Sequence, residues 1–157
     1  MDLPQLPITH RATIPESYLD DMGHMNVMWY TSLFGHGTGG LFDLIGLTDS
    51  YFQTNQAGSF ALEQRFRYLA EVRLGESVTI RTRLLGHSDK LLHAIHIMTK
   101  DQTQVVAATG EFVGAHIDMR VRRTCPFPAE ILQSMDKLVA EHGRVEMDAK
   151  VRPTMKI

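Results

Sequence analysis

Hydrophobic and polar positions alternate with a period of two in the middle of the chain. In residues 60–72 the pattern interleaves apolar and charged side chains, namely Phe60, Leu62, Phe66, Tyr68, Ala70 and Val72 with Glu63, Arg65, Arg67 and Glu71. After a turn at Gly75-Glu76, residues 78–84 repeat the alternation, and apolar runs follow at 91–99 and 105–117. A period of two indicates half-buried antiparallel strands. The pattern therefore predicts four consecutive strands.

Residues 27 to about 45 follow a helical pattern instead. The stretch is apolar on nearly every side, which favours a buried helix over a surface one. Asn26 precedes it, and asparagine caps helices by accepting a hydrogen bond from a free backbone N–H. The glycines of Gly35-His36-Gly37-Thr38-Gly39-Gly40 cost a helix interior up to about 1 kcal/mol each, so they require a break or a close packing partner. We expect close approach to a sheet or a neighbouring subunit, because a phosphate-binding loop would end in Lys-Ser/Thr.

The remaining pattern completes an α+β arrangement. Residues 11–14 are a short strand candidate ended by Pro15, and residues 131–139 have helical spacing with Gly143 at the position of a C-cap glycine. Residues 145–157 show no clear pattern. A buried helix followed by four strands predicts an antiparallel sheet wrapped around a long central helix, plus a C-terminal helix. We expect one domain covering residues 1–157.

Composition excludes several classes of protein. The 157 residues are 43% hydrophobic and 22% charged, and a net charge of −2 offers no basic face for nucleic acid. The single cysteine, Cys125, cannot form an intramolecular disulfide, which is typical of a reducing compartment. No apolar run approaches the ~20 residues that span a bilayer, and no leader pattern begins the chain. We therefore expect a cytoplasmic protein without nucleic-acid or membrane partners.

A candidate catalytic site lies just before the predicted helix. Asp20, Gly23, His24 and Asn26 bring a carboxylate, a glycine, an imidazole and a carboxamide within seven residues. A carboxylate can act as general base or nucleophile, the glycine allows close backbone approach, and a helix N-terminus stabilises a developing oxyanion. The alternative is a plain turn in which these residues serve only the backbone.

The same residues carry a family resemblance. Asp20, Gly23, His24 and Asn26, with Tyr30, resemble the Asp-x-x-Gly-His-x-Asn-x-x-x-Tyr signature of hotdog-fold acyl-CoA thioesterases. The segment 68–78 is similar to the Tyr-x-x-Glu…Gly-Asp-x-Val strand pair of that superfamily. Later segments resemble the branch with betainyl-CoA and carnitine-linked thioesterases, namely Ala108-Thr109-Gly110-Glu111, His116-Ile117-Asp118-Met119, Arg122-Arg123 and Pro126-Phe127-Pro128. The resemblance covers residues 14 to about 132.

This resemblance implies hydrolysis of an acyl-CoA thioester within a hotdog fold. Asp20 would be the catalytic carboxylate, with Gly23 and His24 facing the thioester and Asn26 orienting substrate or water. Plant acyl-carrier-protein thioesterases have an asparagine where this chain has Met22, which removes one carboxamide from the site. Their functional glutamate on the second strand corresponds to Glu71, which ranks below Asp20 because pairing with an arginine is an alternative role for it.

The resemblance also implies assembly from identical subunits. Two hotdog sheets join edge to edge and the active site lies between subunits, which also covers a strand edge that would otherwise stay open. We expect a homodimer, with a homotetramer as the alternative. In such an assembly Glu63 or Glu71 of one subunit would approach Asp20 of the other.

Further residues are candidates for substrate binding. Trp29 and Tyr30 can hold a quaternary ammonium such as betainyl by cation–π attraction, or they only pack in the core. Arg122 and Arg123 would meet the CoA phosphates, or they form a solvated turn. His93 and His96 fall on opposite faces of a strand, so we predict no metal, and no cofactor beyond the CoA of the substrate. The alternatives to a thioesterase are a hydratase or dehydratase acting on acyl thioesters and a non-catalytic acyl-CoA-binding protein.

Overall fold

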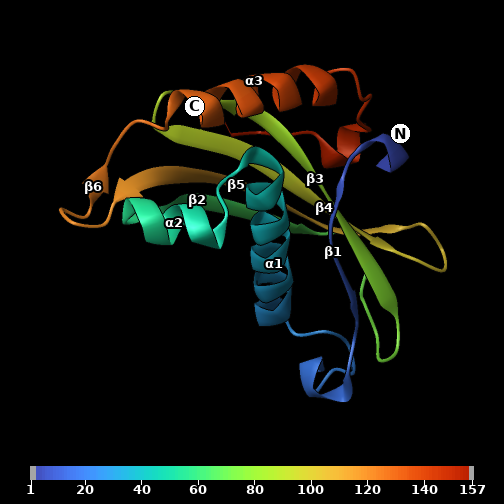
Figure 1. Ribbon diagram of the computed structural model, residues 1–157. Coiled ribbons are helices and arrows are strands. Elements are labelled where there is room, and N and C mark those ends of the chain that lie inside the picture. The colour runs from blue at the N-terminus through green and yellow to red at the C-terminus, as the bar shows by residue number, and fades with distance from the viewer. Residues whose placement is uncertain (1–2, 156–157) are drawn as a thin grey trace.

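The computed structural model describes residues 3–155 and contains three α-helices and six strands in this part of the chain (Figure 1). Their order is β1 (Ile8–Thr13), α1 (Val27–Ile45), α2 (Asp49–Asn55), β2 (Ala57–Tyr68), β3 (Ser77–His87), β4 (Leu91–Lys100), β5 (Val106–Asp118), β6 (Arg123–Thr124) and α3 (Ala129–His142). Three short 3-10 helices are η1 (Leu3–Gln5), η2 (Glu16–Tyr18) and η3 (Ala149–Val151). No helix among the described residues is long and apolar enough to cross a membrane.

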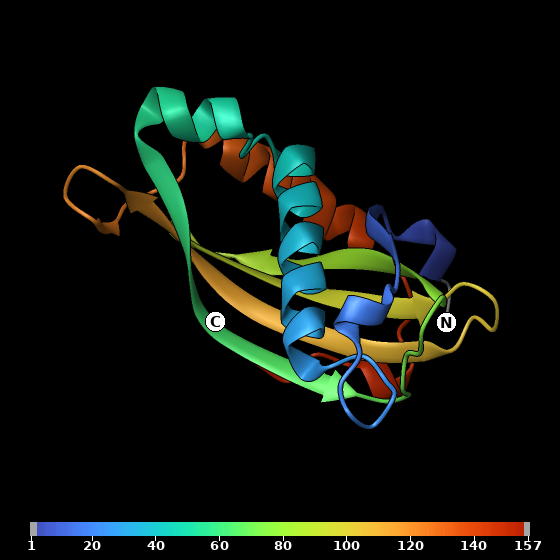
Figure 2. The same cartoon turned by 90° about the horizontal axis from the view of Figure 1, so that it is seen from below.

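The strands form one antiparallel sheet in the order β1-β3-β4-β5-β2, with β6 added to β5. The sheet curves around α1, as the view from below shows (Figure 2). Helix α3 packs on β3 and the end of α1, where Ile131 and Met135 meet Leu41, Ile45 and Leu84. The predicted α+β arrangement, an antiparallel sheet around a long central helix with a C-terminal helix, is confirmed.

Helix α1 begins at the predicted residue because Asn26 caps it: the Asn26 side chain accepts a hydrogen bond from the Met28 backbone N–H at 3.0 Å. Its inner face is apolar and buried, at Tyr30, Leu33, Phe34, Gly37, Leu41 and Ile45. Each such large side chain stabilises the fold by roughly 1.5–3 kcal/mol on burial. The outer face is exposed at Met28 and Leu44. The expectation that α1 is buried on nearly every side is therefore wrong for the single chain.

The glycine run does not break α1, which passes through it without interruption. A Cβ on Gly40 would lie 2.3 Å from the carbonyl oxygen of Thr9 on β1, and one on Gly37 would lie 3.1 Å from the Ile80 methyl on β3. Gly35 and Gly39 have open space around them. Two of the four glycines thus allow the helix to approach the sheet closely, as predicted.

His96 forms a buried polar chain between β4, β3 and α1. The Thr38 hydroxyl donates to the Phe34 carbonyl at 3.1 Å, so its oxygen accepts from His96 Nε2 at 2.9 Å. His96 Nδ1 is then left as the acceptor for the Thr82 hydroxyl at 2.7 Å. The ring is stacked between Phe34 and Phe112. Burial lowers the pKa of His96 to about 3, so the imidazole is neutral in the folded protein.

His96 is expected to make the fold sensitive to acid. Because its pKa is about 3 when folded and 6.5 when unfolded, the folded state binds fewer protons between those values. The contribution of neutral His96 to the free energy of unfolding is fully present above pH 6.5. It falls by up to roughly 5 kcal/mol as the pH drops towards 3. A pH titration followed by imidazole NMR should show His96 no more than about 10% protonated at pH 4 and neutral above pH 5. A titration midpoint near 6 would contradict the buried neutral ring.

Two element boundaries differ from the sequence pattern. Strand β2 ends at Tyr68, four residues before the end of the alternating stretch, and an irregularity between Ala61 and Glu63 leaves Leu62 57% exposed. Strand β1 begins at Ile8 rather than Arg11. Helix α2 had no predicted counterpart. Gly143 does follow α3, but with right-handed backbone angles rather than the left-handed ones of a typical C-cap.

Residues 144–155, which we call the strap, cross the side of the sheet that faces away from α1. Val145 and Val151 pack there against Ile97, whose neighbour His96 faces the helix. The strap ends on the carboxylate of Glu111 in β5, which is 3% exposed. Glu111 accepts hydrogen bonds from the Thr154 backbone N–H and hydroxyl, from the Met155 N–H at 2.8 Å and from His93 Nε2 at 2.8 Å.

These contacts explain how a buried carboxylate is tolerated. Burial by itself would raise the pKa of Glu111, but the hydrogen bonds from Thr154, Met155 and His93 hold that pKa below its ordinary value. The charge is therefore retained on the sheet, and the strap is fixed by it. The segment 145–157 had no predicted structure; its residues 156–157 lie outside the described part of the chain.

Candidate active site

The loop before α1 is a tight turn whose ends are held together. Leu19 and Met25 form an isolated antiparallel bridge, and the Asp20 backbone N–H donates to the His24 carbonyl at 3.0 Å. Gly23 has φ +79°, which a side chain would strain. No atom lies within 4 Å of the position of a Cβ at Gly23, so glycine is required by the turn and not by a neighbour. The Met25 N–H fixes the loop to the Val72 carbonyl at 2.7 Å.

Asp20 and His24 form an oriented pair within this turn. Asp20 Oδ1 accepts from the Met22 backbone N–H at 2.9 Å, which turns Oδ2 towards His24 Nδ1 at 3.4 Å. The side chains are 25% and 37% exposed, so water reaches both. With Nδ1 directed at the carboxylate, the other ring nitrogen of His24 is left for a substrate or a water molecule. Asp20, Gly23, His24 and Asn26 therefore lie close together, in one turn and the N-cap of α1 that follows it.

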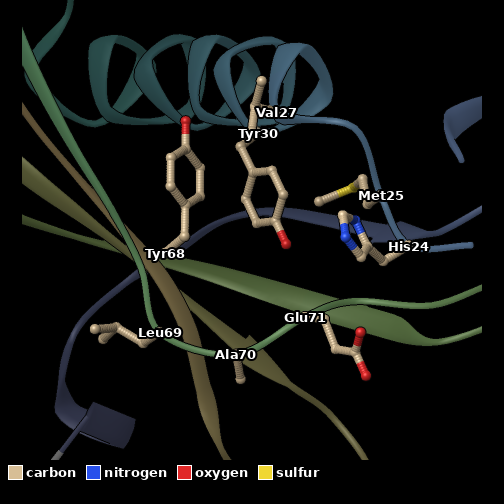
Figure 3. A pocket seen from close by; sticks show the side chains of 8 residues that line it. All are labelled: His24, Met25, Val27, Tyr30, Tyr68, Leu69, Ala70 and Glu71. Atoms are coloured by element: carbon tan, nitrogen blue, oxygen red, sulfur yellow. The ribbon is translucent and has the colours of Figure 1, made fainter. Parts of the chain in front are cut away.

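A pocket of about 310 Å³ opens beside this pair (Figure 3). It is lined by three segments: the end of the loop, the start of α1, and the last residue of β2 with the residues that follow it. The lining residues are His24, Met25, Val27, Tyr30, Tyr68, Leu69, Ala70 and Glu71. His24 lines the pocket, whereas Asp20 is not among the lining residues. Asp20 therefore lies outside the pocket lining, behind His24.

Aromatic side chains form one wall of the pocket. Tyr30 and Tyr68 meet edge to face, with ring centroids 5.0 Å apart (Figure 3). Burial raises the pKa of Tyr30, which keeps its hydroxyl protonated. Trp29 instead stacks on Tyr18 at 3.7 Å and is absent from the pocket wall. Of Trp29 and Tyr30, the two aromatic residues singled out in the sequence, Tyr30 lines the pocket and Trp29 does not. The second aromatic residue of the pocket is Tyr68.

Glu71 lies on the side of the pocket away from α1 (Figure 3). It comes after the end of β2 rather than on the strand. Its carboxylate forms an ion pair with Arg73, and its backbone carbonyl accepts from Lys100 Nζ at 3.2 Å. Lys100 also pairs with Glu76 at 2.6 Å. Glu71 is thus both a pocket residue and the arginine partner that the sequence offered as an alternative.

The structure does not bring the other candidate residues to this pocket within one chain. Glu63 is exposed in the middle of β2. Arg122 lies over the ring of Phe60 at 5.4 Å, and Arg123 is in β6, at the opposite end of β2. A strand of 12 residues separates the two ends by roughly 35 Å.

No group of three or more metal-binding side chains occurs in residues 3–155. His93 pairs with Glu111 on one side of the sheet and His96 lies on the other, as their spacing predicts. His116 makes a structural hydrogen bond, from the Tyr51 hydroxyl at 2.9 Å. The absence of a metal or added cofactor from the activity stays a prediction.

The sequence is similar to those of known thioesterases. The sequence pattern of the thioesterase-like superfamily matches residues 15–135. The chain is 33% identical over 132 residues to L-carnitine dehydrogenase/betainyl-CoA thioesterase of Agrobacterium fabrum, covering 84% of this chain and 27% of that protein. It is 29% identical over 138 residues to betainyl-CoA thioesterase of Pseudomonas aeruginosa, covering 88% and 87%. The chain therefore spans about a quarter of the bifunctional relative.

Solved structures agree with the fold. A protein of Pseudomonas putida KT2440, proposed to be a thioesterase, superimposes with a TM-score of 0.81 at 31% identity over 97% of both chains. A hypothetical Staphylococcus aureus protein in complex with CoA gives a TM-score of 0.85 over 97% and 96% of the two chains. At 21% identity, the second likeness shows the fold alone.

Proposed function

Because the chain belongs to the thioesterase-like superfamily, we propose that it is an acyl-CoA thioesterase, which hydrolyses a CoA thioester to a free acid and CoA. The observation that carries this proposal is the Asp20–His24 pair, held at the mouth of a pocket where α1 begins. A carboxylate, an imidazole and a helix N-terminus at one point are the groups that water needs to attack a thioester carbonyl.

The proposed reaction begins with water held near His24. Its oxygen forms a bond to the thioester carbonyl carbon while its proton passes to Asp20, directly or through His24; the lining of the pocket by His24 favours the second route. The negative charge that develops on the carbonyl oxygen is stabilised by the positive end of α1, next to Val27 in the pocket wall. The C–S bond then breaks, and the CoA thiolate takes up the proton. Direct attack by the Asp20 carboxylate is the alternative first step.

For the acyl group we propose a quaternary ammonium such as betainyl. The pocket combines the Tyr30 and Tyr68 rings with the Glu71 carboxylate, and both kinds of group attract a cation that cannot donate hydrogen bonds. The two relatives whose names include betainyl-CoA thioesterase support this choice. Trp29, which is stacked on Tyr18, has no part in this proposal.

A homodimer is proposed as the smallest assembly. Strand β2 is at the edge of the sheet, and an open strand edge is usually paired or covered. Leu62 on this edge strand exposes its apolar side chain. Antiparallel pairing of two β2 strands would bring the β6 end of one subunit, with Arg122 and Arg123, towards the Glu71 end of the other. A tetramer and a cytoplasmic location stay predictions of the sequence.

The test is a panel of acyl-CoA thioesters, including betainyl-CoA, short straight-chain and aromatic acyl-CoAs, with free thiol as the readout. Thiol release in this panel would support the thioesterase, and the preferred substrate would define its acyl group. Hydration of an enoyl-CoA without thiol release would indicate the hydratase alternative. Tight binding without turnover would indicate an acyl-CoA-binding protein.

Tyr68→Leu is expected to reduce selectivity for the quaternary ammonium. Loss of a cation–π contact of about 0.5–2 kcal/mol should raise the KM for betainyl-CoA roughly 2- to 30-fold. The KM for acetyl-CoA should change little, because that acyl group has no cation. Tyr68→Phe keeps the ring and serves as the control. Equal losses with both substrates would remove Tyr68 from acyl recognition.

A further inference from the structure

A second pocket, of about 530 Å³, lies on the side of the sheet that faces away from α1. Arg83 and Leu85 of β3 form one wall, and Met147, Arg152 and Pro153 of the strap form the other. The pocket is on the opposite side because Thr82, the neighbour of Arg83 on β3, points to His96 and the helix. It is therefore separate from the candidate active site of the same chain.

Arg83 is a partly buried cation that forms no ion pair within the described part of the chain. Its Nη1 donates to the Val145 carbonyl at 2.8 Å, which fixes the guanidinium against the strap. Burial lowers the pKa of Arg83, and no carboxylate in residues 3–155 forms an ion pair with it. The pKa of His142 is lowered by burial and then by the Arg83 charge. The charge of Arg83 thus lowers the pKa of its neighbour His142 and is not balanced by a described carboxylate.

Two further guanidinium groups add to this charge. Arg152 lines the same pocket. Arg81 precedes Arg83 by two residues on β3, so it is on the same face of the sheet, and its Nε is buried with no hydrogen-bond partner. Buried polar atoms nearly always have partners, so this N–H is an unused donor on the same side of the sheet as Arg83. Glu146 also lines the pocket but forms no described ion pair with these arginines.

We propose that this pocket is a second ligand site, which binds the phosphate group of a small organic anion. Guanidinium groups match phosphate oxygens through paired N–H donors. Arg83 would hold the phosphate from the sheet and Arg152 from the strap, while Leu85 and Met147 contact the organic part. Such a ligand would link the strap to β3 and stabilise the strap on the sheet. The site does not depend on thioester hydrolysis.

The test is isothermal titration calorimetry of the full chain with inorganic phosphate, glycerol 3-phosphate and acetate, in a chloride buffer of constant ionic strength. Saturable binding of both phosphate compounds, tighter for glycerol 3-phosphate, is expected. Arg83→Gln should weaken this binding at least about tenfold, because a charge-assisted contact is lost. Arg152→Gln should do the same, and it leaves the bond between Arg83 and the strap intact. Arg11→Gln, an equal charge change on exposed β1, is the control and should bind normally.

Three outcomes would overturn the proposal. The first is an absence of saturable phosphate binding by the wild-type chain. The second is normal binding by both Arg83→Gln and Arg152→Gln, or an equal loss in the Arg11→Gln control. The third is binding of acetate as tight as that of phosphate, which would assign the pocket to carboxylates. Because the readout is binding and not turnover, failure here is distinct from failure of the thioesterase assay.

Discussion

Asp20→Asn is expected to lower kcat for the preferred acyl-CoA by about 10²- to 10⁴-fold, the usual contribution of a general base. The amide can still accept the hydrogen bond from the Met22 N–H that fixes the side chain, so the loop should keep its shape. What is lost is the negative charge 3.4 Å from His24 Nδ1, and with it the group proposed to take the proton of water. Substrate binding, and therefore KM, should change little.

Asp21→Asn is the matched control for this prediction. Asp21 is the next residue, carries the same charge and is exposed. Its replacement should leave kcat within about twofold, because it has no contact with His24 or the pocket. Thiol release should be measured with both variants after their folding and oligomeric state are compared with wild type. An undiminished rate in Asp20→Asn would exclude Asp20 as base or nucleophile.

Gly40→Ala is expected to destabilise the fold by about 3 kcal/mol, the upper range for an overpacked core. The added methyl group would lie 2.3 Å from the Thr9 carbonyl oxygen, a distance that two non-bonded atoms cannot keep. Because that oxygen belongs to the β1 backbone, relief requires α1 and β1 to move apart. Separation of this pair would also disturb the close approach of the helix at Gly37, where a Cβ would lie 3.1 Å from Ile80 and 3.2 Å from His96.

Gly39→Ala, one residue earlier, provides the comparison in urea unfolding. Outside its own stretch of helix, no atom of residues 3–155 lies within 4 Å of its Cβ position, so the variant should gain up to about 1 kcal/mol from the higher helix propensity of alanine. Equal stability of the two variants would contradict the close approach of α1 to β1. A loss of stability in Gly39→Ala would indicate instead that a second subunit covers the outer face of α1.

The strands and the start of the long helix were predicted well because their signals are local. Strand β3 partly alternates between buried and half-buried positions, whereas β4 and β5 are continuous apolar runs because both of their sides are buried. Helix α1 begins at Val27 because its cap, Asn26, is local. Helix α2 was missed because its seven residues, Asp49–Asn55, are too few to show a helical period and include polar side chains.

The sequence predicted which candidate residues lie together before α1, but not which residues line the pocket beside them. Asp20, His24 and Asn26 are close in sequence, so one turn is sufficient to bring them together. Whether Trp29 or Tyr30 faces the pocket depends on the rotation of α1, since neighbouring helical residues point about 100° apart. The place of Tyr68 depends on where β2 ends. Those positions are set by long-range packing, which no local pattern records.

The contact between Glu111 and the strap has a consequence for the order in which the protein matures during its synthesis. The ribosome makes β5 before Thr154, whose N–H is 43 residues further along the chain. In the interval, the Glu111 carboxylate has His93 as a neighbour on the sheet but lacks the backbone donors that later surround it. A nascent chain with its sheet already paired would therefore keep this side open to water. The strap can cover this side of the sheet only after Thr154 and Met155 have been synthesised. We therefore expect the strap to pack on the sheet late in folding.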